Sequence, residues 1–435
     1  MSSSKCLNFL MLISLTGIAS QAQPRDPGIR SGTLGAGQPM AGLGAGELDY
    51  FTTHGIPQFT EIEAVANGLG PRFNLDSCGG CHAFPAVGGS SPPMNNPQVI
   101  RAALMAPGNT VPHFLASNGP VREVRFKTNP NGTPDGGVHA IFTIAGRSDK
   151  PAGCTISQPN FSDSNNIVFR VPTPVFGAGL IEAITDTTIR NNLANDFSGK
   201  KAGLGIKGHV NTNGNDGTVT RFGWKAQNKS LMIFAGEAYN VEMGVTNENF
   251  PNEREENPNC SKNGTPESLT AFAVGNSDPA DIVSFVAFMK FLDQPTPACT
   301  GGECSASIQN GHTLFIQIGC SFCHTETLMT GLSSTAALNN KPAHLFSDLA
   351  VHHMGAELAD GITQGSAGPD EFRTAPLWGL GQRAFFLHDG RTNDLAETIE
   401  AHGGSGSEAS KVVSAFQSVL SSAQQQDLLN FLRSL

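Results

Sequence analysis

The sequence predicts a mainly α-helical fold in which two similar units follow one another along the chain. Three observations support this prediction. A C-x-x-C-H motif occurs twice, at residues 78–82 and 320–324. The short segments that follow each motif recur in the same order, and each half closes on an apolar stretch of helical character, at 281–292 and 427–435. Such a repeat is typical of one structural unit used twice in tandem.

Each C-x-x-C-H motif has the spacing of a covalent haem attachment site. The two thiols add to the vinyl groups of one haem, and the adjacent histidine coordinates the iron. A zinc ribbon would pair two C-x-x-C units close together and a redox dithiol would lie near a βαβ pattern, and neither context occurs here. We therefore expect two cytochrome c-like domains, each with one covalently bound haem c. Haem one and haem two would be held, in that order, by Cys78, Cys81 and His82, and by Cys320, Cys323 and His324.

The repeated order also indicates the domain boundaries. We expect an N-terminal domain at 23–296 and a C-terminal domain at 297–435, joined near the Pro-containing segment 293–297. Residues 121–126 and 138–142 alternate roughly like strands and are flanked by Asn, Gly and Pro turns. The first domain is therefore expected to carry a small β-rich insertion, whose role the sequence does not reveal.

Residues 1–22 have the features of a secretory signal peptide. Lys5 precedes an apolar run at 7–15, and small residues surround Gln21 at the expected cleavage site. No later stretch is long and apolar enough for a membrane span. We expect a periplasmic or secreted protein, which suits c-type haem because this group is attached outside the cytoplasm.

Four cysteines of the mature chain remain outside the haem motifs: Cys154, Cys260, Cys299 and Cys304. An even number in an oxidising compartment favours two disulfides, with free structural thiols as the alternative. Cys299 and Cys304 are near neighbours, and Cys154 could then pair with Cys260, although the sequence does not determine the connectivity.

The formal net charge of −10 argues against a nucleic-acid partner. The same charge permits a basic electron-transfer partner.

Several further segments carry a resemblance to a known family. They are L-G-P-R-F-N at 69–74, G-G-S-S-P at 88–92, F-G-W-K-A at 222–226, E-M-G-V-T at 242–246, F-R-T-A-P-L-W-G-L-G-Q-R at 372–383 and H-D-G-R at 388–391. In this order around two haem motifs, they resemble the di-haem oxidoreductases, relatives of bacterial di-haem cytochrome c peroxidase. The resemblance covers nearly the whole mature chain.

The resemblance implies that haem one activates peroxide while haem two passes electrons. The tryptophan that bridges the domains in the peroxidases corresponds to Trp224, and the E-M pair of the peroxidatic half corresponds to Glu242 and Met243. The distal ligand of haem two corresponds to His402, where the peroxidases have methionine. Two histidine ligands would lower the potential of haem two, because imidazole favours ferric iron more than a thioether does. His352 and His353 beside Met354 form a second cluster that could compete with His402.

Haem one departs from the peroxidase pattern, because no histidine follows its motif closely in the sequence. The resemblance therefore implies an open, five-coordinate iron. Four residues remain alternative ligands: Met94, His113, His139 and Met243.

The chemistry of peroxide reduction suggests roles for further residues. Glu242 is expected to move a proton between the peroxide oxygens, because a carboxyl group in an apolar pocket has a raised pKa. Glu182 is the second choice for this role. Trp224 would relay electrons, with core packing as the alternative. Three arginines are expected near haem propionates, unless they hold interdomain carboxylates instead: Arg170, Arg373 and Arg391.

The sequence and the resemblance together predict an exported enzyme that reduces hydrogen peroxide with electrons from a small donor protein, a cytochrome c or a copper protein. One alternative is a di-haem enzyme that oxidises a partner protein or an organic substrate. The other is a plain electron-transfer cytochrome with both irons six-coordinate. An interdomain calcium site is left open.

Overall fold

The computed structural model describes residues 23–31, 35–129, 131–134, 140–253, 257–261, 263–271 and 278–435. The signal peptide predicted at 1–22 and the alternative ligand His139 lie outside these residues. No helix in the described ranges has both the length and the apolar character needed to cross a membrane.

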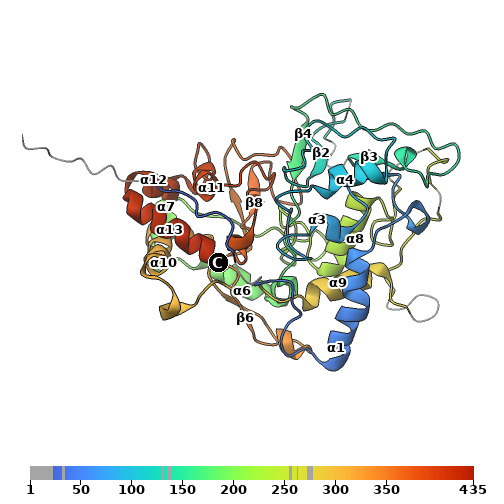
Figure 1. Cartoon of the computed structure of the whole chain (residues 1–435). Helices are drawn as coiled ribbons and strands as arrows, with labels where there is room; N and C mark the ends of the chain where they lie inside the picture. Colours follow the sequence, from blue (N-terminus) through green and yellow to red (C-terminus); the bar gives the residue numbers. More distant parts are fainter. Residues whose placement is uncertain are drawn as a thin grey trace, which may run out of the picture.

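The helices gather into two lobes that lie side by side in Figure 1. The first lobe contains α1 (Ala45–Tyr50), α2 (Ile56–Thr60), α3 (Cys78–Cys81), α4 (Pro97–Leu104), α8 (Leu231–Met243) and α9 (Asp281–Phe291). The second lobe contains α7 (Lys200–Leu204), α10 (Ala306–Ile318), α11 (Leu395–Ala401), α12 (Ser410–Ser418) and α13 (Ser422–Ser434). Two short helices lie between these groups, α5 (Ala178–Ala183) and α6 (Asp186–Ala194).

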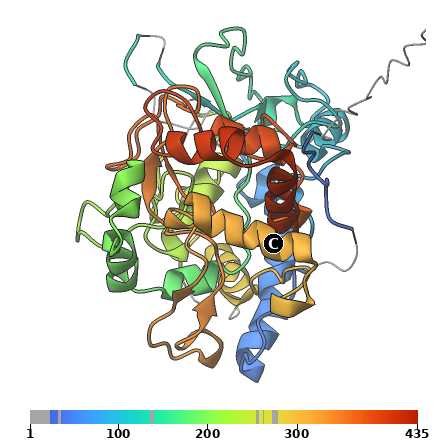
Figure 2. The same cartoon turned by 90° about the vertical axis from the view of Figure 1, so that its left-hand side faces the viewer.

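The pair α10 and α13 forms the centre of the second lobe, which faces the viewer in Figure 2. The side chain of Ser305 caps α10 by accepting a hydrogen bond from the Ile308 amide, and Gly319 ends the helix in the left-handed region at φ 105°. Gly311 lets the two helices approach closely, because a Cβ atom there would lie 2.0 Å from the Asp427 carbonyl oxygen. The second C-x-x-C-H motif follows α10 directly, so this contact places the motif beside the pair of α10 and α13.

The first lobe is organised around α9, which is apolar on nearly all sides and is therefore buried. Phe288 of α9 stacks on Phe51 and on Phe59, with ring centroids 5.6 and 4.2 Å apart. Helix α5 also packs on α9 through Gly179, where a Cβ atom would lie 2.0 Å from the Lys290 carbonyl oxygen. Helix α8 packs on α9 as well and brings Glu242 next to the first motif.

The strands form antiparallel pairs only, in the described part of the chain. The pairs are β1 (Arg72–Phe73) with β3 (Phe142–Thr143), β2 (Glu123–Phe126) with β4 (Ile167–Arg170), β5 (Leu328–Met329) with β6 (Pro342–Ala343), and β7 (Val351–His353) with β8 (Glu371–Arg373). The strand expected at 121–126 is present as β2. Of the strand expected at 138–142, only residue 142 lies in a described strand.

Two hydrophobic cores correspond to the two lobes, and each takes residues from across the predicted boundary at 296–297. Leu328, Leu345 and Trp378 belong to the first core, whereas Ile206 belongs to the second. Residues from both halves of the chain therefore pack into each core. The domain boundary at 296–297 stays a prediction.

Candidate functional site

The first C-x-x-C-H motif opens onto a cavity, which we call the first cavity. Helix α3 presents Cys78 and Cys81 to it, and His82 follows directly. The opposite walls come from α8, from β2, from the end of β4 and from the segment around Trp224. The cavity thus joins segments that lie more than 100 residues apart.

The second motif lines a larger cavity, which we call the second cavity. Cys320, Cys323 and His324 lie on its wall together with His402, which follows α11. The walls also include apolar residues of α12 and α13. The two motifs and His402 therefore lie in two separate pockets, as expected for one haem in each half.

All three predicted histidine ligands have the same polar contact. The Nδ1 atom donates to a backbone carbonyl oxygen, namely Gly89 for His82 (3.1 Å), Phe346 for His324 (3.0 Å) and Thr398 for His402 (2.7 Å). Such a bond fixes the ring and leaves Nε2 as the nitrogen that ligates a metal. Burial lowers the pKa of His82 and His324 to about 4 and also lowers that of His402, so that each imidazole is neutral.

The residues of the second cavity fit a haem. Its two cysteines are outside any disulfide. Arg373 is buried and Arg383 half-buried on the cavity wall, and removal from water lowers the pKa of both to about 10. No carboxylate of the described residues pairs with either guanidinium, and Nη1 of Arg373 has no hydrogen-bond partner there. Haem propionates would supply the missing negative charge.

Two of the three arginines expected at propionates have other partners. Arg170 donates to Asp360 (2.6 Å) and to Gln364 (2.8 Å), so that it holds a carboxylate from the other half of the chain. Arg391 is exposed and pairs with its neighbour Asp389 (2.8 Å). Arg170 therefore shows the alternative role that was expected, a bond to a carboxylate of the other half, and a propionate role for these two arginines stays a prediction. Arg383 was missed, since a single arginine in a Gly-rich stretch carries no pattern.

Glu242 lies near the C-terminal end of α8 and lines the first cavity beside Cys78 and Cys81. Burial and the nearby Glu123 carboxylate raise the pKa of its carboxyl, Arg125 lowers it, and the result is a pKa of about 8. Both of these residues belong to β2, and Nε of Arg125 donates to Glu123 (3.1 Å). Strand β2 therefore adds charged groups to the first cavity that the sequence could not assign to it.

The alternative proton mover, Glu182, lies away from both cavities. Its carboxylate accepts a hydrogen bond from the Leu231 amide at the start of α8 (2.8 Å). This contact is a helix-capping role, so that Glu182 is a structural residue.

The described residues contain one histidine on the wall of the first cavity, His82. Met94 and His113 are exposed at the surface and do not line the cavity. Met243 lines it, but its sulfur lies 3.8 Å from Sγ of Cys78, next to the attachment residue. Of the alternative ligands of haem one, Met243 alone thus reaches the cavity in the described part.

Trp224 lies on the wall of both cavities. Its Nε1 atom donates to the Val171 carbonyl oxygen (2.9 Å), which fixes the indole between the lobes. His388 lies beside it, with ring centroids 6.4 Å apart, and stacks on Phe372 at 4.4 Å. The rings of Trp224 and His388 thus contact each other where the two cavities meet.

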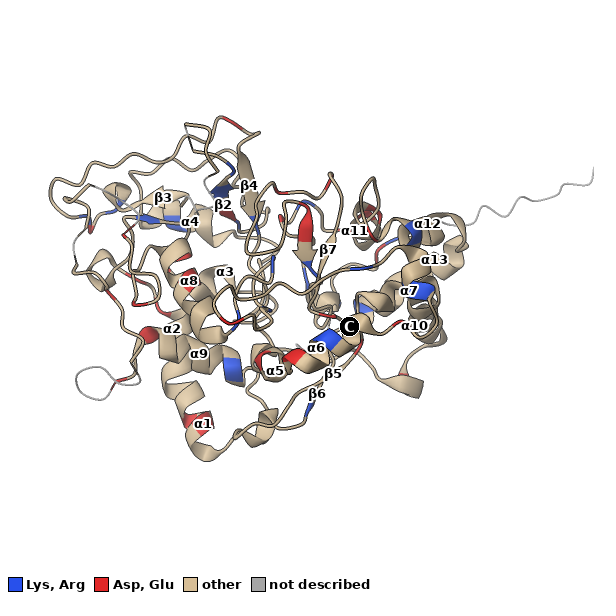
Figure 3. Cartoon of the chain, turned by 180° about the vertical axis from the view of Figure 1, so that it is seen from behind, with Lys and Arg blue, Asp and Glu red and all other residues tan. Residues whose placement is uncertain are grey.

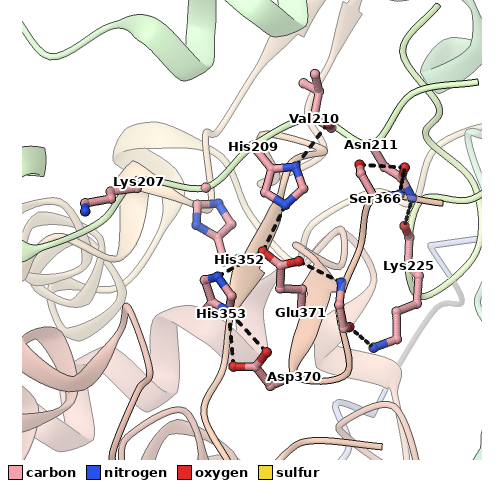
Figure 4. A network of polar contacts seen from close by, with 12 residues as sticks. Lys207, His209, Val210, Asn211, Lys225, His352, His353, Ser366, Asp370 and Glu371 are labelled. Atoms are coloured by element: carbon pink, nitrogen blue, oxygen red, sulfur yellow. Dashed lines mark hydrogen bonds and ion pairs between the residues drawn. The ribbon is translucent and has the colours of Figure 1, made fainter. Parts of the chain in front are cut away.

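Residues 352–354 form the cluster that could replace His402 as the ligand of haem two. His352 is buried with both ring nitrogens engaged, Nε2 to Asp348 (3.0 Å) and Nδ1 to Glu408 (2.8 Å). Burial lowers its pKa, but the Asp348 carboxylate and the nearby Cys323 outweigh this effect and raise the pKa well above the usual value. His353 points to Asp370 and Glu371 at the surface (Figure 4). His352 and Met354 both line the second cavity, whereas His353 does not.

Within the described ranges, no group of three or more His, Cys, Asp or Glu side chains is placed to hold a metal ion. The interdomain calcium site therefore stays untested.

The comparison with protein families agrees with this arrangement. The family model described as "Di-haem oxidoreductase, putative peroxidase" matches residues 128–435. The chain therefore belongs to the di-haem oxidoreductase family, and the family resemblance is confirmed. This family implies haem as the cofactor. The matched residues include the second C-x-x-C-H motif, Trp224 and Glu242, whereas the first motif precedes them.

Solved structures show weaker likenesses. A MauG-like protein associated with microbial copper homeostasis is 16% identical, with 66% of this chain and 92% of that chain covered and a TM-score of 0.29. The diheme peroxidase BthA from Burkholderia thailandensis is 13% identical, with 72% and 94% covered and a TM-score of 0.29. Hydrazine synthase from Kuenenia stuttgartiensis is 18% identical over 37% of this chain and 56% of that chain, with a TM-score of 0.24. The comparison with curated proteins found no match.

Proposed function

We propose that this di-haem oxidoreductase is an exported peroxidase that reduces hydrogen peroxide in the first cavity with electrons that arrive through the second. The observation that carries this proposal is the composition of the first cavity. It combines a C-x-x-C-H motif with a buried carboxyl group, Glu242, and the described residues add no second histidine that could close the iron. Both haems would be covalently attached, because the four thiols of the two motifs are free of disulfides.

The reaction consumes one peroxide, two electrons and two protons and gives two water molecules. A haem bound in the first cavity would supply the iron and the redox chemistry that cleaves the O–O bond. Glu242 accepts a proton from one peroxide oxygen and returns it to the oxygen that leaves as water. Its pKa of about 8 suits this exchange, because an acid–base group works best when its pKa is near the working pH.

The second cavity collects electrons in this proposal. His324 and His402 are its two ligand histidines, since both have a carbonyl-bound Nδ1 and face the same pocket. Trp224 passes electrons between the cavities, because its side chain borders both. Arg373 and Arg383 hold the propionates of haem two. The donor is a small electron-transfer protein in the periplasm or outside the cell.

The test is the substitution Glu242→Gln, which keeps the shape of the side chain and removes its acid–base function. We expect peroxide turnover to fall by roughly 10²-fold or more, which is the usual contribution of a general acid–base group. The electron paramagnetic resonance spectra of the ferric protein should stay unchanged. Glu182→Gln is the matched control, because Glu182 lies away from both cavities, and it should retain turnover. Unchanged turnover in Glu242→Gln would remove Glu242 from the mechanism.

A further inference from the structure

A group of exposed lysines surrounds the short helix α7 on the second lobe. Lys200, Lys207 and Lys411 are exposed, and together with Phe197 they form the lysine patch. Residues 195–211 contain three lysines and one acidic residue, and residues 409–421 contain one lysine and no acidic residue. The patch is therefore locally positive on a chain whose formal net charge is −10. Figure 3 shows the basic residues of α7 and α12 on neighbouring ribbons at one end of the molecule.

Hydrogen bonds tie the patch together. Nζ of Lys200 donates to the Gln317 carbonyl oxygen at the end of α10 (2.5 Å), and Nζ of Lys411 donates to the Gly203 carbonyl oxygen of α7 (2.8 Å). Lys207 follows α7, and its side chain points away from the histidine cluster in Figure 4. The three ammonium groups thus lie around one helix, although they come from two distant parts of the chain.

The carboxylates nearest in sequence are held by other groups. Asp196 accepts hydrogen bonds from the amides of Lys201 and Ala202 at the start of α7. Glu408 accepts from the amides of Lys207 and Gly208 and pairs with the buried His352. Neither forms an ion pair with the ammonium groups of the patch among the described salt bridges. The positive charge of the patch is therefore not neutralised at the surface.

The patch covers the wall of the second cavity on the Cys320 side. Ile206 lies between Lys207 and α7 and lines that cavity, and Gly319 and Cys320 follow Gln317 on the same wall. On the other side, Val412 follows Lys411 and also lines it. A protein that bound the lysine patch would therefore be separated from haem two by little more than one layer of residues.

Phe197, three residues before Lys200, adds an exposed apolar side chain to the patch. Its side chain is 101% exposed, the highest value among the large hydrophobic residues of the described part. A fully exposed phenylalanine keeps its whole apolar surface in water, whereas protein interfaces typically bury an aromatic side chain as an anchor inside a polar rim. The combination of one exposed ring with surrounding lysines therefore has the composition of a docking surface.

We propose that the lysine patch is the docking surface for a small acidic one-electron carrier protein, which delivers electrons to haem two. This inference rests on the proposed function and names the charge of the donor and its place of binding. Each docking event oxidises the carrier by one electron and reduces haem two by one electron, so that two events serve one peroxide. The net charge of the chain permitted a basic partner, but the local charge at this wall favours an acidic one because exposed charges act within about 10 Å at 0.1 M salt.

The first test measures how fast haem two is reduced, without peroxide, in the full-length ferric protein. Reduced plant-type ferredoxin serves as the acidic carrier and a reduced basic c-type cytochrome as its counterpart, in stopped-flow absorbance measurements. With ferredoxin, the rate constant should fall as salt is added. The variant Lys207→Glu should lower it roughly threefold to tenfold at low salt and have no effect at high salt. Lys150→Glu is the matched control, because Lys150 is an exposed lysine in the first half of the chain, and it should leave the rate unchanged.

A second readout does not depend on electron transfer. Carbodiimide cross-linking of ferredoxin to the protein, followed by peptide mass spectrometry, should join ferredoxin carboxylates to Lys200, Lys207 and Lys411. Cross-links at other lysines, or a rate constant that falls with added salt for the basic cytochrome but not for ferredoxin, would overturn the proposal. Neither measurement uses peroxide, so failure of the docking surface is distinguishable from failure of the peroxidase function.

Discussion

At the scale of single residues, the acid–base group of the first cavity depends on charges from a neighbouring strand. Glu242 is on α8, whereas Glu123 and Arg125 are on β2, and all three line the first cavity. Burial and the Glu123 carboxylate raise the pKa of Glu242, and the guanidinium of Arg125 lowers it. The proton affinity of Glu242 is thus a property of two elements.

Removal of Arg125 should change the pH dependence of the reaction. Glu242 must be ionised to accept a proton, so kcat/KM for peroxide should rise with pH through an apparent pKa of about 8. Without the positive charge of Arg125, the pKa of Glu242 rises further, and the Arg125→Gln variant should show this rise at higher pH. Arg125→Lys keeps the charge and should restore the original profile. A pH profile that is identical in all three proteins would contradict this account.

The ligand role of His402 has a spectroscopic consequence. Replacement by Gly leaves haem two with His324 as its one strong-field protein ligand, so the low-spin ferric signal of haem two should become high-spin. Electron paramagnetic resonance of the ferric protein measures this change. Met354→Leu is the matched control, since Met354 lines the same cavity and its loss should leave the signal unchanged. If the two variants show the opposite pattern, Met354 is the ligand.

At the scale of secondary-structure elements, each lobe contains one helix pair that depends on a glycine. In the first lobe Gly179 of α5 lies against the Lys290 carbonyl of α9, and in the second Gly311 of α10 lies against the Asp427 carbonyl of α13. In both places a Cβ atom would be 2.0 Å from backbone oxygen. These glycines are therefore needed for close packing rather than for a turn.

The substitution Gly311→Ala tests this packing. The added methyl group forces α10 away from α13, so the free energy of unfolding should fall by about 1–3 kcal/mol, the usual cost of overpacking. Gly203→Ala in α7 is the matched control, because a Cβ atom there meets nothing within 4 Å. This control should gain about 0.5–1 kcal/mol, since alanine favours a helix more than glycine does. Denaturant unfolding measures both changes, and equal stability of the two variants would refute the packing argument.

At the scale of the whole molecule, a buried ion cluster joins the two halves of the chain. Asp360 pairs with Arg170 (2.6 Å) and with Lys225 (3.0 Å), and the side chains of all three are at most 2% exposed. Lys225 also donates to the carbonyl oxygen of Gly368 (2.8 Å) and lies 4.1 Å from the centre of the Phe372 ring. The cluster lies beside Trp224 in the chain and holds the lobes together where both cavities meet.

Neutralising Asp360 should destabilise the whole protein. In Asp360→Asn, two buried cations lose their counter-ion, and breaking a buried ion pair in this way typically costs about 3–5 kcal/mol. The melting temperature should therefore fall markedly. Asp216→Asn removes one partner of the exposed pair with Lys229 and should change the melting temperature very little. A melting temperature of Asp360→Asn equal to that of this control would show that the cluster does not hold the lobes together.

Two kinds of feature could be predicted from the sequence. One is a motif whose residues lie close together along the chain, and the other is a pairing with few possible partners. The C-x-x-C-H motifs place three expected haem-binding residues within five positions, and the motif order identified the family that the comparison confirmed. The disulfides Cys154–Cys260 and Cys299–Cys304 also form as expected, because only four cysteines remained to pair.

The tertiary structure decided what depends on contacts between distant segments. It placed Trp224 on both cavities, joined Arg170 to Asp360 across 190 residues, and put Arg383 on the second cavity. It also set the surroundings of Glu242 and collected the lysine patch from two separate segments. Charge and reactivity at these places depend on which side chains are in contact. Sequence spacing does not determine these contacts when long loops connect the segments.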